Sequence, residues 1–248
     1  MAYPFCFSLK KIKTMNYLSA NIQNALRELG FTTPQDIANA GAVKVFLLLK
    51  EWGLTPTKSV LWRLDAVARN IALSEIDDQR KQALSGCLKN HPPVAIFPPL
   101  SEMQQFMHIA LDEAKLAYEQ GEVPVGAVVV QNGKIIAQAH NACEQQGNVL
   151  QHAEINVLSQ AMKVCGTSRL ADCDLYITLE PCLMCAGAIL HARIRRLIFA
   201  AFEPKTGVSG SLNNVFADKK LNHHTAVFQG VYEKQAQKLL KAFFSIKR

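Results

Sequence analysis

The sequence predicts a small all-α domain followed by an α/β/α three-layer domain with a mixed sheet. Three observations support this prediction. Apolar residues recur at helical spacing before residue 89, four prolines gather between residues 89 and 100, and helix-like and strand-like segments alternate after residue 100. With 248 residues, 49% of them apolar, the chain is long enough to bury two cores.

The all-α domain is expected at residues 15–88, after a disordered extension at residues 1–14. The lysines of that extension follow its apolar residues, whereas a secretory signal carries its positive charge first. A targeting role is therefore not expected. Met15 opens a sequence that reads as a domain start, and the choice between Met1 and Met15 as the true start stays open.

Helical spacing and capping residues place the helices of this domain. Gly30 is expected to end the first helix, and Thr33 and Pro34 fit the N-cap and first position of the next. Apolar residues at helical spacing mark helices at 22–29, 43–50 and 61–71.

A linker is expected at residues 89–100, because proline cannot continue a helix and pushes the preceding residue into an extended conformation. The second domain, residues 101–248, is expected to begin with a helix whose Ser101 and Gln104 form a capping box. Asn132-Gly133 between two apolar runs predicts a β-hairpin. Further strands are expected at 175–179 and 196–200, and further helices at 155–165, 182–191 and 232–243.

Two short motifs in the second domain carry the chemistry. His152-Ala153-Glu154 is followed about thirty residues later by Pro181-Cys182-Leu183-Met184-Cys185. Cys182 and Cys185 are three residues apart at a predicted helix start, so they share one face, and the helix N-terminus lowers thiol pKa values. Together with His152 they make three ligands for Zn²⁺, which leaves the open coordination position of a catalytic site.

The unpaired carboxylate of Glu154 is expected to act as a proton shuttle and not as a ligand. Zinc with an open position holds water and lowers its pKa, so a zinc-bound hydroxide is the expected nucleophile. The two motifs together resemble the signature of base-deaminating enzymes, in which the glutamate is the proton shuttle. Two alternatives stay open. Cys173 could complete a closed structural site, and a Cys-x-x-Cys pair can also be redox-active.

The net charge of +7 is unevenly placed. From Leu183 to Arg248, eleven basic and three acidic side chains leave a net charge of +8. Such a segment suits a polyanionic partner, although solvated lysines on a C-terminal helix would give the same count. No apolar run reaches the ~18 residues of a membrane span, so no membrane association is expected. Seven cysteines, with a pair that needs reduced thiolates, predict a cytoplasmic protein.

These motifs and their flanks resemble the bacterial tRNA-specific adenosine deaminases (TadA-type) over about residues 102–246. The likeness is carried by Glu122 to Val128, Asn141, the two motifs, Lys205-Thr206-Gly207 and Gly210-Ser211-Leu212. The resemblance implies a cytidine-deaminase-like α/β/α fold, a homodimer, and conversion of the wobble adenosine of a tRNA anticodon stem-loop to inosine.

The resemblance also implies roles for individual residues. It makes His152, Cys182 and Cys185 the ligands of one zinc ion per subunit and Glu154 the proton shuttle. It places Asn141 and the backbone of Ala153 at the flipped base, and Lys205, Phe243 and Phe244 near the RNA.

The first domain resembles the C-terminal domain of the TfoX competence regulators over about residues 17–86, and its partner is not evident from the sequence. Two other functions stay open at this stage. One is a free-base or nucleoside deaminase acting on guanine or cytosine, which would not need the basic segment. The other is a competence-related nucleic-acid-binding protein with structural zinc.

Overall fold

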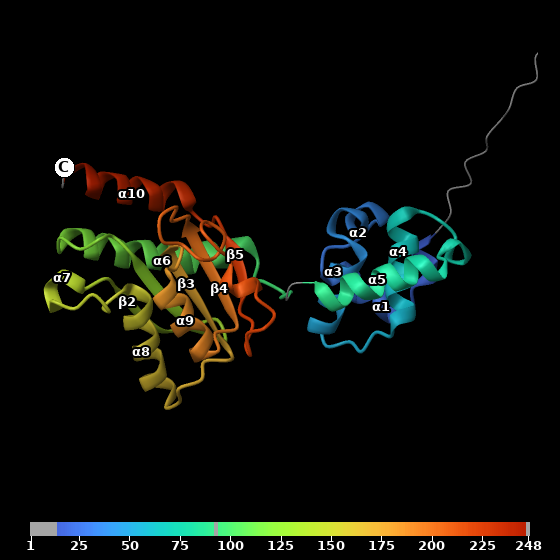
Figure 1. The fold of residues 1–248 in the computed structure, drawn as a ribbon, viewed down its shortest axis with the longest axis horizontal. Coiled ribbons are helices and arrows are strands. Elements are labelled where there is room, and N and C mark those ends of the chain that lie inside the picture. The colour runs from blue at the N-terminus through green and yellow to red at the C-terminus, as the bar shows by residue number, and fades with distance from the viewer. Residues whose placement is uncertain (1–13, 92–93, 247–248) are drawn as a thin grey trace, which may run out of the picture. The chain divides into compact units, whose positions relative to one another are not determined.

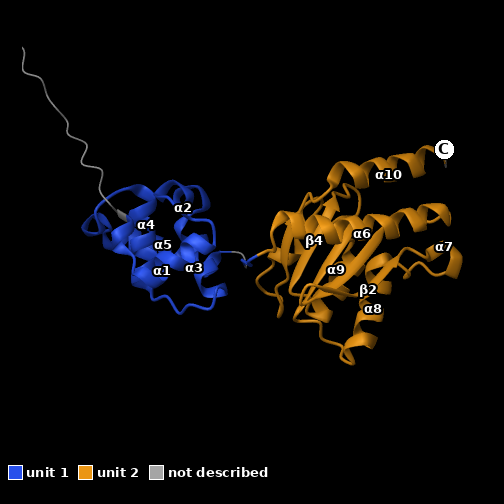
Figure 2. Cartoon of the chain, turned by 180° about the vertical axis from the view of Figure 1, so that it is seen from behind, with its two compact units in different colours: residues 1–96 blue, residues 97–248 orange. Residues whose placement is uncertain are grey.

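The chain forms two compact units, residues 1–96 and residues 97–248 (Figure 2). The computed structural model describes residues 14–91 and 94–246, so residues 1–13 of the expected extension lie outside the described part. Within the described residues, none of the helices combines the length and the apolar character that crossing a membrane requires.

The first unit is helical throughout its described residues, as predicted. Its core is lined by apolar side chains from all five α-helices, and the largest that are fully buried include Leu26, Phe46 and Leu61. The helices are α1 (Ala20–Glu28), α2 (Pro34–Ala40), α3 (Ala42–Glu51), α4 (Lys58–Arg69) and α5 (Asp78–Asn90), with 3-10 turns η1 (Thr14–Tyr17) and η2 (Leu73–Glu75).

Local capping explains where α2 begins. The Thr33 side chain accepts a hydrogen bond from Asp36 N at 3.2 Å, and Asp36 Oδ2 accepts one from Thr33 N at 2.7 Å, which completes a capping box. The last helix, α5, lies outside the helices predicted from apolar spacing. It is tied to α4 by the buried Asp65, which receives two hydrogen bonds from Arg80 at 2.9 and 2.6 Å.

The second unit is built on a five-stranded sheet with the order β2-β1-β3-β4-β5 (Figure 1). β1 pairs antiparallel with β2 and with β3, whereas β3–β4 and β4–β5 are parallel, so the sheet is mixed as predicted. The strands are β1 (Gly126–Gln131), β2 (Lys134–His140), β3 (Cys173–Leu179), β4 (Arg196–Ala201) and β5 (Ala226–Gln229).

Helices cover both faces of this sheet, which gives the expected three layers. The helices are α6 (Leu100–Glu119), α7 (Cys143–Gln146), α8 (Ala153–Cys165), α9 (Leu183–Ala192) and α10 (Glu233–Ile246), with a 3-10 turn η3 (Val215–Ala217). Alternate strand residues point to opposite faces. Leu175 and Ile177 pack with α8 and α9, whereas Tyr176 and Ile198 pack with α6 and α10.

Some local expectations are confirmed and others are wrong. The hairpin turn is confirmed, with positive φ at Asn132 (51°) and Gly133 (72°), as a two-residue hairpin requires. The capping box at Ser101 is wrong, because α6 begins at Leu100, with Pro99 as its N-cap and without a side-chain cap. The short strand β5 was not predicted, since its four residues have no flanking alternation to mark them.

Candidate active site

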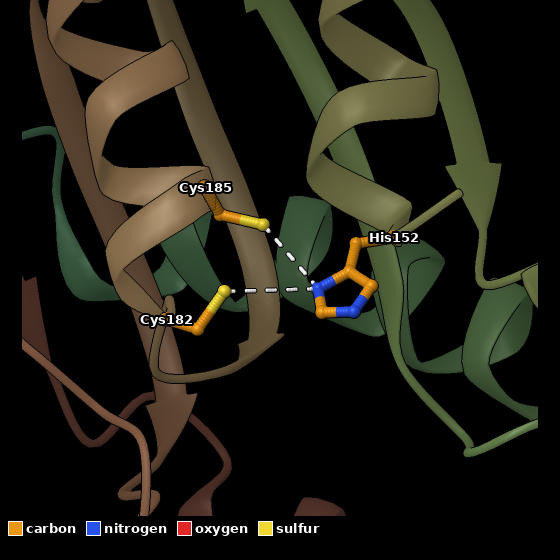
Figure 3. A group of neighbouring side chains, drawn as sticks. All are labelled: His152, Cys182 and Cys185. Atoms are coloured by element: carbon orange, nitrogen blue, oxygen red, sulfur yellow. Dashed lines mark hydrogen bonds between the residues drawn. The ribbon is translucent and has the colours of Figure 1, made fainter. Parts of the chain in front are cut away.

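Three potential metal ligands meet where two helices begin. His152 is the N-cap of α8, Cys182 is the N-cap of α9, and Cys185 is the third residue of α9. Figure 3 shows the imidazole facing both thiols across the gap between the two helix starts. Pro181 directly precedes the N-cap Cys182 and so lies outside α9.

The spacing of these ligand atoms fits a zinc ion. His152 Nδ1 lies 3.4 Å from Cys185 Sγ and 3.8 Å from Cys182 Sγ. Tetrahedral zinc with its usual bond lengths holds such nitrogen and sulfur atoms about 3.6 Å apart. Among the described residues the candidate metal group contains only these three side chains, and Cys173 is not part of it. A zinc ion held by these three side chains would keep one coordination position for a reactant.

The two thiols differ in their ionisation. Hydrogen bonds from Cys185 and His152 lower the pKa of Cys182 to about 4, although burial acts in the opposite direction. The pKa of Cys185 is raised, by its hydrogen bond to Cys182 and by burial. The hydrogen bond between the two thiols thus favours the thiolate at Cys182 and the protonated form at Cys185, whereas the sequence led us to expect a lowered pKa at both.

Glu154 is the second residue of α8, and only 4% of its surface is exposed. Burial raises the pKa of its carboxyl group. A carboxyl group with a raised pKa holds a proton more readily, and general acid–base catalysis needs a group that both accepts and returns a proton. Glu154 is not one of the ligand group, in agreement with a proton-transfer role.

A cavity of about 190 Å³ joins the predicted site residues. It brings together Asn141, His152, Glu154 and Cys182. Its other lining residues were not predicted, and they are Val123, Val125, Leu179, Glu180, Glu203 and Thr206. A signal for Glu180 was present in the sequence, since a charged residue directly between a buried strand and a metal ligand has little room to reach solvent.

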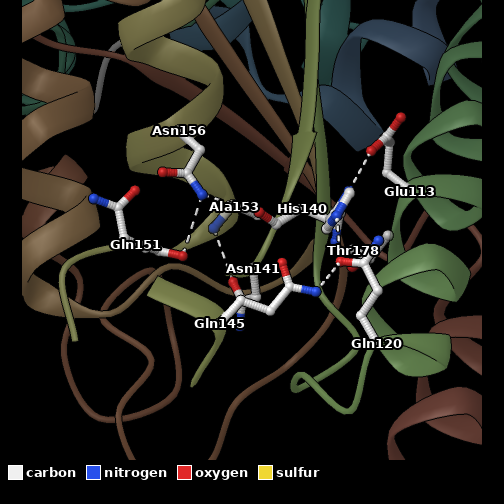
Figure 4. A network of polar contacts seen from close by, with 10 residues as sticks. Glu113, Gln120, His140, Asn141, Gln145, Gln151, Ala153, Asn156 and Thr178 are labelled. Atoms are coloured by element: carbon white, nitrogen blue, oxygen red, sulfur yellow. Dashed lines mark hydrogen bonds and ion pairs between the residues drawn. The ribbon is translucent and has the colours of Figure 1, made fainter. Parts of the chain in front are cut away.

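Asn141 is held in place by its neighbours (Figure 4). Its Oδ1 accepts a hydrogen bond from Ala153 N at 2.8 Å, which leaves the Nδ2 hydrogens available for a ligand. The preceding residue, His140, pairs through Nδ1 with the buried Glu113 of α6 at 2.6 Å. The Ala153 N–H therefore acts on Asn141 and is not itself free to contact a base.

The three residues expected near RNA lie outside the cavity. Lys205 is exposed on the segment after β4, between the cavity residues Glu203 and Thr206. Phe244 is 50% exposed on α10. Phe243 is buried, with its ring 6.0 Å from that of Tyr118, so it supports α10 from inside the unit.

Known proteins with this sequence pattern are deaminases. The model of the MafB19-like deaminases matches residues 101–246, more than half of the chain. The chain belongs to the MafB19-like deaminase family. This deaminase is 46% identical over 145 residues to the tRNA-specific adenosine deaminase of Bacillus subtilis (strain 168), a stretch that covers 58% of this chain and 90% of that protein. It is 43% identical over 149 residues to the tRNA-specific adenosine deaminase of Agrobacterium fabrum, covering 60% of this chain and 98% of that one.

Solved structures agree with this membership. One, from a study of A-to-I editing by tRNA:A34 deaminases at the wobble position of transfer RNA, is 43% identical with a TM-score of 0.54, and the match covers 55% of this chain and 99% of that one. It confirms the cytidine-deaminase-like fold. A structure in complex with 8-azaguanine is 23% identical with a TM-score of 0.51 and covers 58% of this chain and 85% of that one, so it supports the fold alone.

The first unit of this deaminase is similar to a different family. Residues 9–88 match the model of the TfoX C-terminal domain, which confirms the resemblance seen in the sequence. The deaminase relatives leave this part unmatched, because they cover about 60% of the chain or less.

Proposed function

We propose that this deaminase converts adenosine to inosine at the wobble position of a tRNA anticodon loop by hydrolysis. One observation carries the proposal. The cavity is lined by His152, Cys182, Glu154 and Asn141, and it belongs to a unit that matches tRNA-specific adenosine deaminases over nearly their whole length. The free-base alternative has less support. The relatives named above at 43–46% identity are tRNA-specific adenosine deaminases, whereas the structure in complex with 8-azaguanine is only 23% identical.

Zinc is the proposed cofactor, with His152, Cys182 and Cys185 as its ligands. When bound, zinc supplies Lewis acidity that makes a water molecule nucleophilic at neutral pH. The carboxylate of Glu154 takes the proton of the attacking water, delivers it to the adenine ring nitrogen, and carries a second proton to the departing amine. Adenosine and water thus give inosine and ammonia, and proton transfer of this kind contributes ~10²–10⁴-fold to rate.

Asn141 is proposed to orient the base. Its Oδ1 is fixed by Ala153 N, so its Nδ2 hydrogens point to an acceptor on the ligand. The backbone of Asn141 is fixed as well, because Asn141 N donates a hydrogen bond to Val125 O at 3.1 Å. The side chain is therefore already in place before the base binds, and binding need not order it.

The basic segment after Cys182 is proposed to receive the anticodon stem-loop. Deaminases act on bases that are flipped out or single-stranded, and RNA loops present such bases beside their phosphates. Exposed Lys205 and Phe244 supply a phosphate contact and a stacking surface in this segment. The reduced thiols of the metal site fit the cytoplasmic location predicted from the sequence.

A homodimer through the deaminase unit is also proposed. Leu183 follows the metal ligand Cys182 and is 65% exposed, and Leu190 and Val215 line a hollow of about 480 Å³ with it. Leu190 and Val215 are partly buried, so Leu183 is the exposed apolar group at this hollow, and apolar patches on a surface can mark interaction sites. Sedimentation of the protein and of its Leu183→Glu variant tests this, and a wild-type monomer at micromolar concentration contradicts it.

The function is tested by ammonia release from an anticodon stem-loop compared with free adenine, guanine and cytosine. We expect turnover of the stem-loop and inosine at the wobble position. In Glu154→Gln, zinc is retained and the rate falls by about 10² or more. Turnover of free bases alone rejects the tRNA substrate, and an unchanged rate in Glu154→Gln rejects the proton-transfer role.

A further inference from the structure

Glu180 is a buried carboxylate that the proposed chemistry does not use. It lies between the end of β3 and Cys182 and is 2% exposed. Its Oε1 accepts hydrogen bonds from Ser209 N at 2.7 Å and Ser211 N at 3.0 Å. Its Oε2 accepts one from Glu203 N at 3.0 Å and another from the Ser211 hydroxyl. Both oxygens are thus occupied by the protein.

All four donors belong to one segment, residues 203–211, which follows β4. This segment also reaches the metal side of the site, since Gly207 forms an antiparallel bridge with Cys182 and Val208 N donates to Pro181 O at 3.1 Å. Gly207 lies so close that a Cβ there would be 2.4 Å from Glu180 Cδ and Oε2. The segment therefore closes around the carboxylate, with no room for another side chain at Gly207.

A charge is costly to bury unless several donors satisfy it, and hydrogen bonds to an ionised acceptor are stronger than neutral ones. Glu180 is 2% exposed, and its two oxygens accept four hydrogen bonds from Glu203, Ser209 and Ser211, which is the donor set that a buried carboxylate requires. The same segment supplies Glu203 and Thr206 to the cavity wall.

We propose that Glu180 is a positioning residue, which fixes the 203–211 segment against the metal-ligand turn and so sets the substrate-facing wall of the cavity. The proposal rests on the proposed deamination, because the wall matters only for the substrate bound there. Glu180 lines the cavity, but both of its carboxylate oxygens accept hydrogen bonds from the 203–211 segment, and it is not one of the proposed metal ligands. Its loss is therefore expected to weaken substrate binding more than it slows the chemical step.

The test is Glu180→Gln, which keeps the volume of the side chain but removes its charge and turns one acceptor into a donor that faces N–H groups. Hydrogen–deuterium exchange in 203–211 is expected to rise about tenfold or more, since a factor of ten corresponds to only ~1.4 kcal/mol. KM for the stem-loop is expected to rise about tenfold, with kcat changed less than about threefold and zinc content unchanged.

Asp174→Asn is the matched control. Asp174 lies at the other end of β3, is 3% exposed, and accepts hydrogen bonds from Arg195 and Arg196 rather than from the segment. Its loss of charge should lower the melting temperature without changing exchange in 203–211 or KM. Equal effects in the two variants would mean that Glu180 acts only through general stability, and would overturn the proposal.

Two variants on the other side of the contact complete the test. Gly207→Ala pushes a methyl group into the carboxylate, so it should reproduce the effects of Glu180→Gln, and the double variant should be no worse than either single one. Ser211→Ala removes one donor and should change exchange and KM in the same direction but less, which keeps the test decisive if Glu180→Gln does not fold.

Unchanged exchange in 203–211 in these variants overturns the proposal, and so does a loss of zinc or of kcat with KM unchanged. Hydrogen–deuterium exchange needs no substrate, so it tests the positioning role of Glu180 independently of activity. If the wild-type protein does not deaminate the stem-loop, the proposed function is rejected, and the exchange result still decides the role of Glu180.

Discussion

Gly126→Ala is expected to be one of the most damaging single methyl additions to the deaminase unit. Gly126 begins β1 where this strand crosses α6. A Cβ at this position would lie 2.1 Å from Ala110 O and 2.5 Å from Ala114 N. To restore a contact of 3.0 Å, the strand and the helix must separate locally by about 0.9 Å. Both obstacles are backbone atoms, so no side-chain rotation relieves the clash.

The size of the effect follows from this geometry. Overpacking a core typically costs ~1–3 kcal/mol, and we expect about 3 kcal/mol or more here because a helix backbone must move. For a unit of this size each kcal/mol lowers the melting temperature by roughly 2–4 °C. The transition of the deaminase unit should therefore fall by roughly 6–12 °C. Activity should fall too, because the neighbouring Val125 lines the cavity and anchors Asn141.

Thermal unfolding followed by circular dichroism measures this shift, with Gly86→Ala as the control. Gly86 lies on the exposed face of α5, and a Cβ there meets nothing within 4 Å. The same substitution should stabilise the first unit by up to about 1 kcal/mol, because alanine is the better helix former. A Gly126→Ala protein within ~0.5 kcal/mol of wild type would refute the steric reasoning.

Three further outcomes are expected. Chelation of zinc should abolish activity and lower the melting temperature of the deaminase unit alone, and added Zn²⁺ should restore both; activity that survives complete chelation rejects the metal site. Asn141→Ala should raise KM and also destabilise the start of α8, because Ala153 N loses its acceptor; a normal KM rules out base contact. Hydrogen bonds from Thr33 hold the pKa of Asp36 below its usual value, so its contribution to the first unit is present at neutral pH and lost as pH falls through that lowered value. In acid-unfolding curves Asp36→Asn should therefore differ from wild type at pH 6 and match it near pH 2, and a constant difference excludes this linkage.

Short-range patterns predicted much of this molecule. The hairpin at Asn132-Gly133 and the capping box at Thr33 each depend on neighbouring residues, so the sequence displays them directly. The metal ligands could also be found, because Cys182 and Cys185 share one helix start and only His152 had to be brought from elsewhere. The alternation of helix-like and strand-like segments after residue 100 predicted helices packed on a central mixed sheet.

Long-range contacts could not be predicted in the same way. The donors of Glu180 lie 23 to 31 residues further along the chain, and no local pattern marks a backbone N–H as a partner. Phe243 is buried because α10 packs on α6, where the ring of Phe243 meets that of Tyr118. The neighbouring Phe243 and Phe244 look alike in the sequence, so the sequence does not show which of the two is buried. Ser101 is not the N-cap of α6, because the helix already begins at Leu100, directly after Pro99. Proline, with its fixed φ, is also common at helix starts, so the sequence offered two possible starts.

The parallel pairing of β3 with β4 has a consequence for how this enzyme could be altered. Parallel strands end at the same edge of a sheet, so the turn that carries Cys182 and the 203–211 segment emerge side by side. One carries the proposed metal ligand Cys182 and the other supplies Glu203 and Thr206 to the cavity wall, yet neither is part of the five-stranded sheet. Substitutions at Glu203 and Thr206 can therefore change the cavity wall without changing a strand of the sheet. Selection or design could use such positions to alter substrate preference at little cost to folding stability.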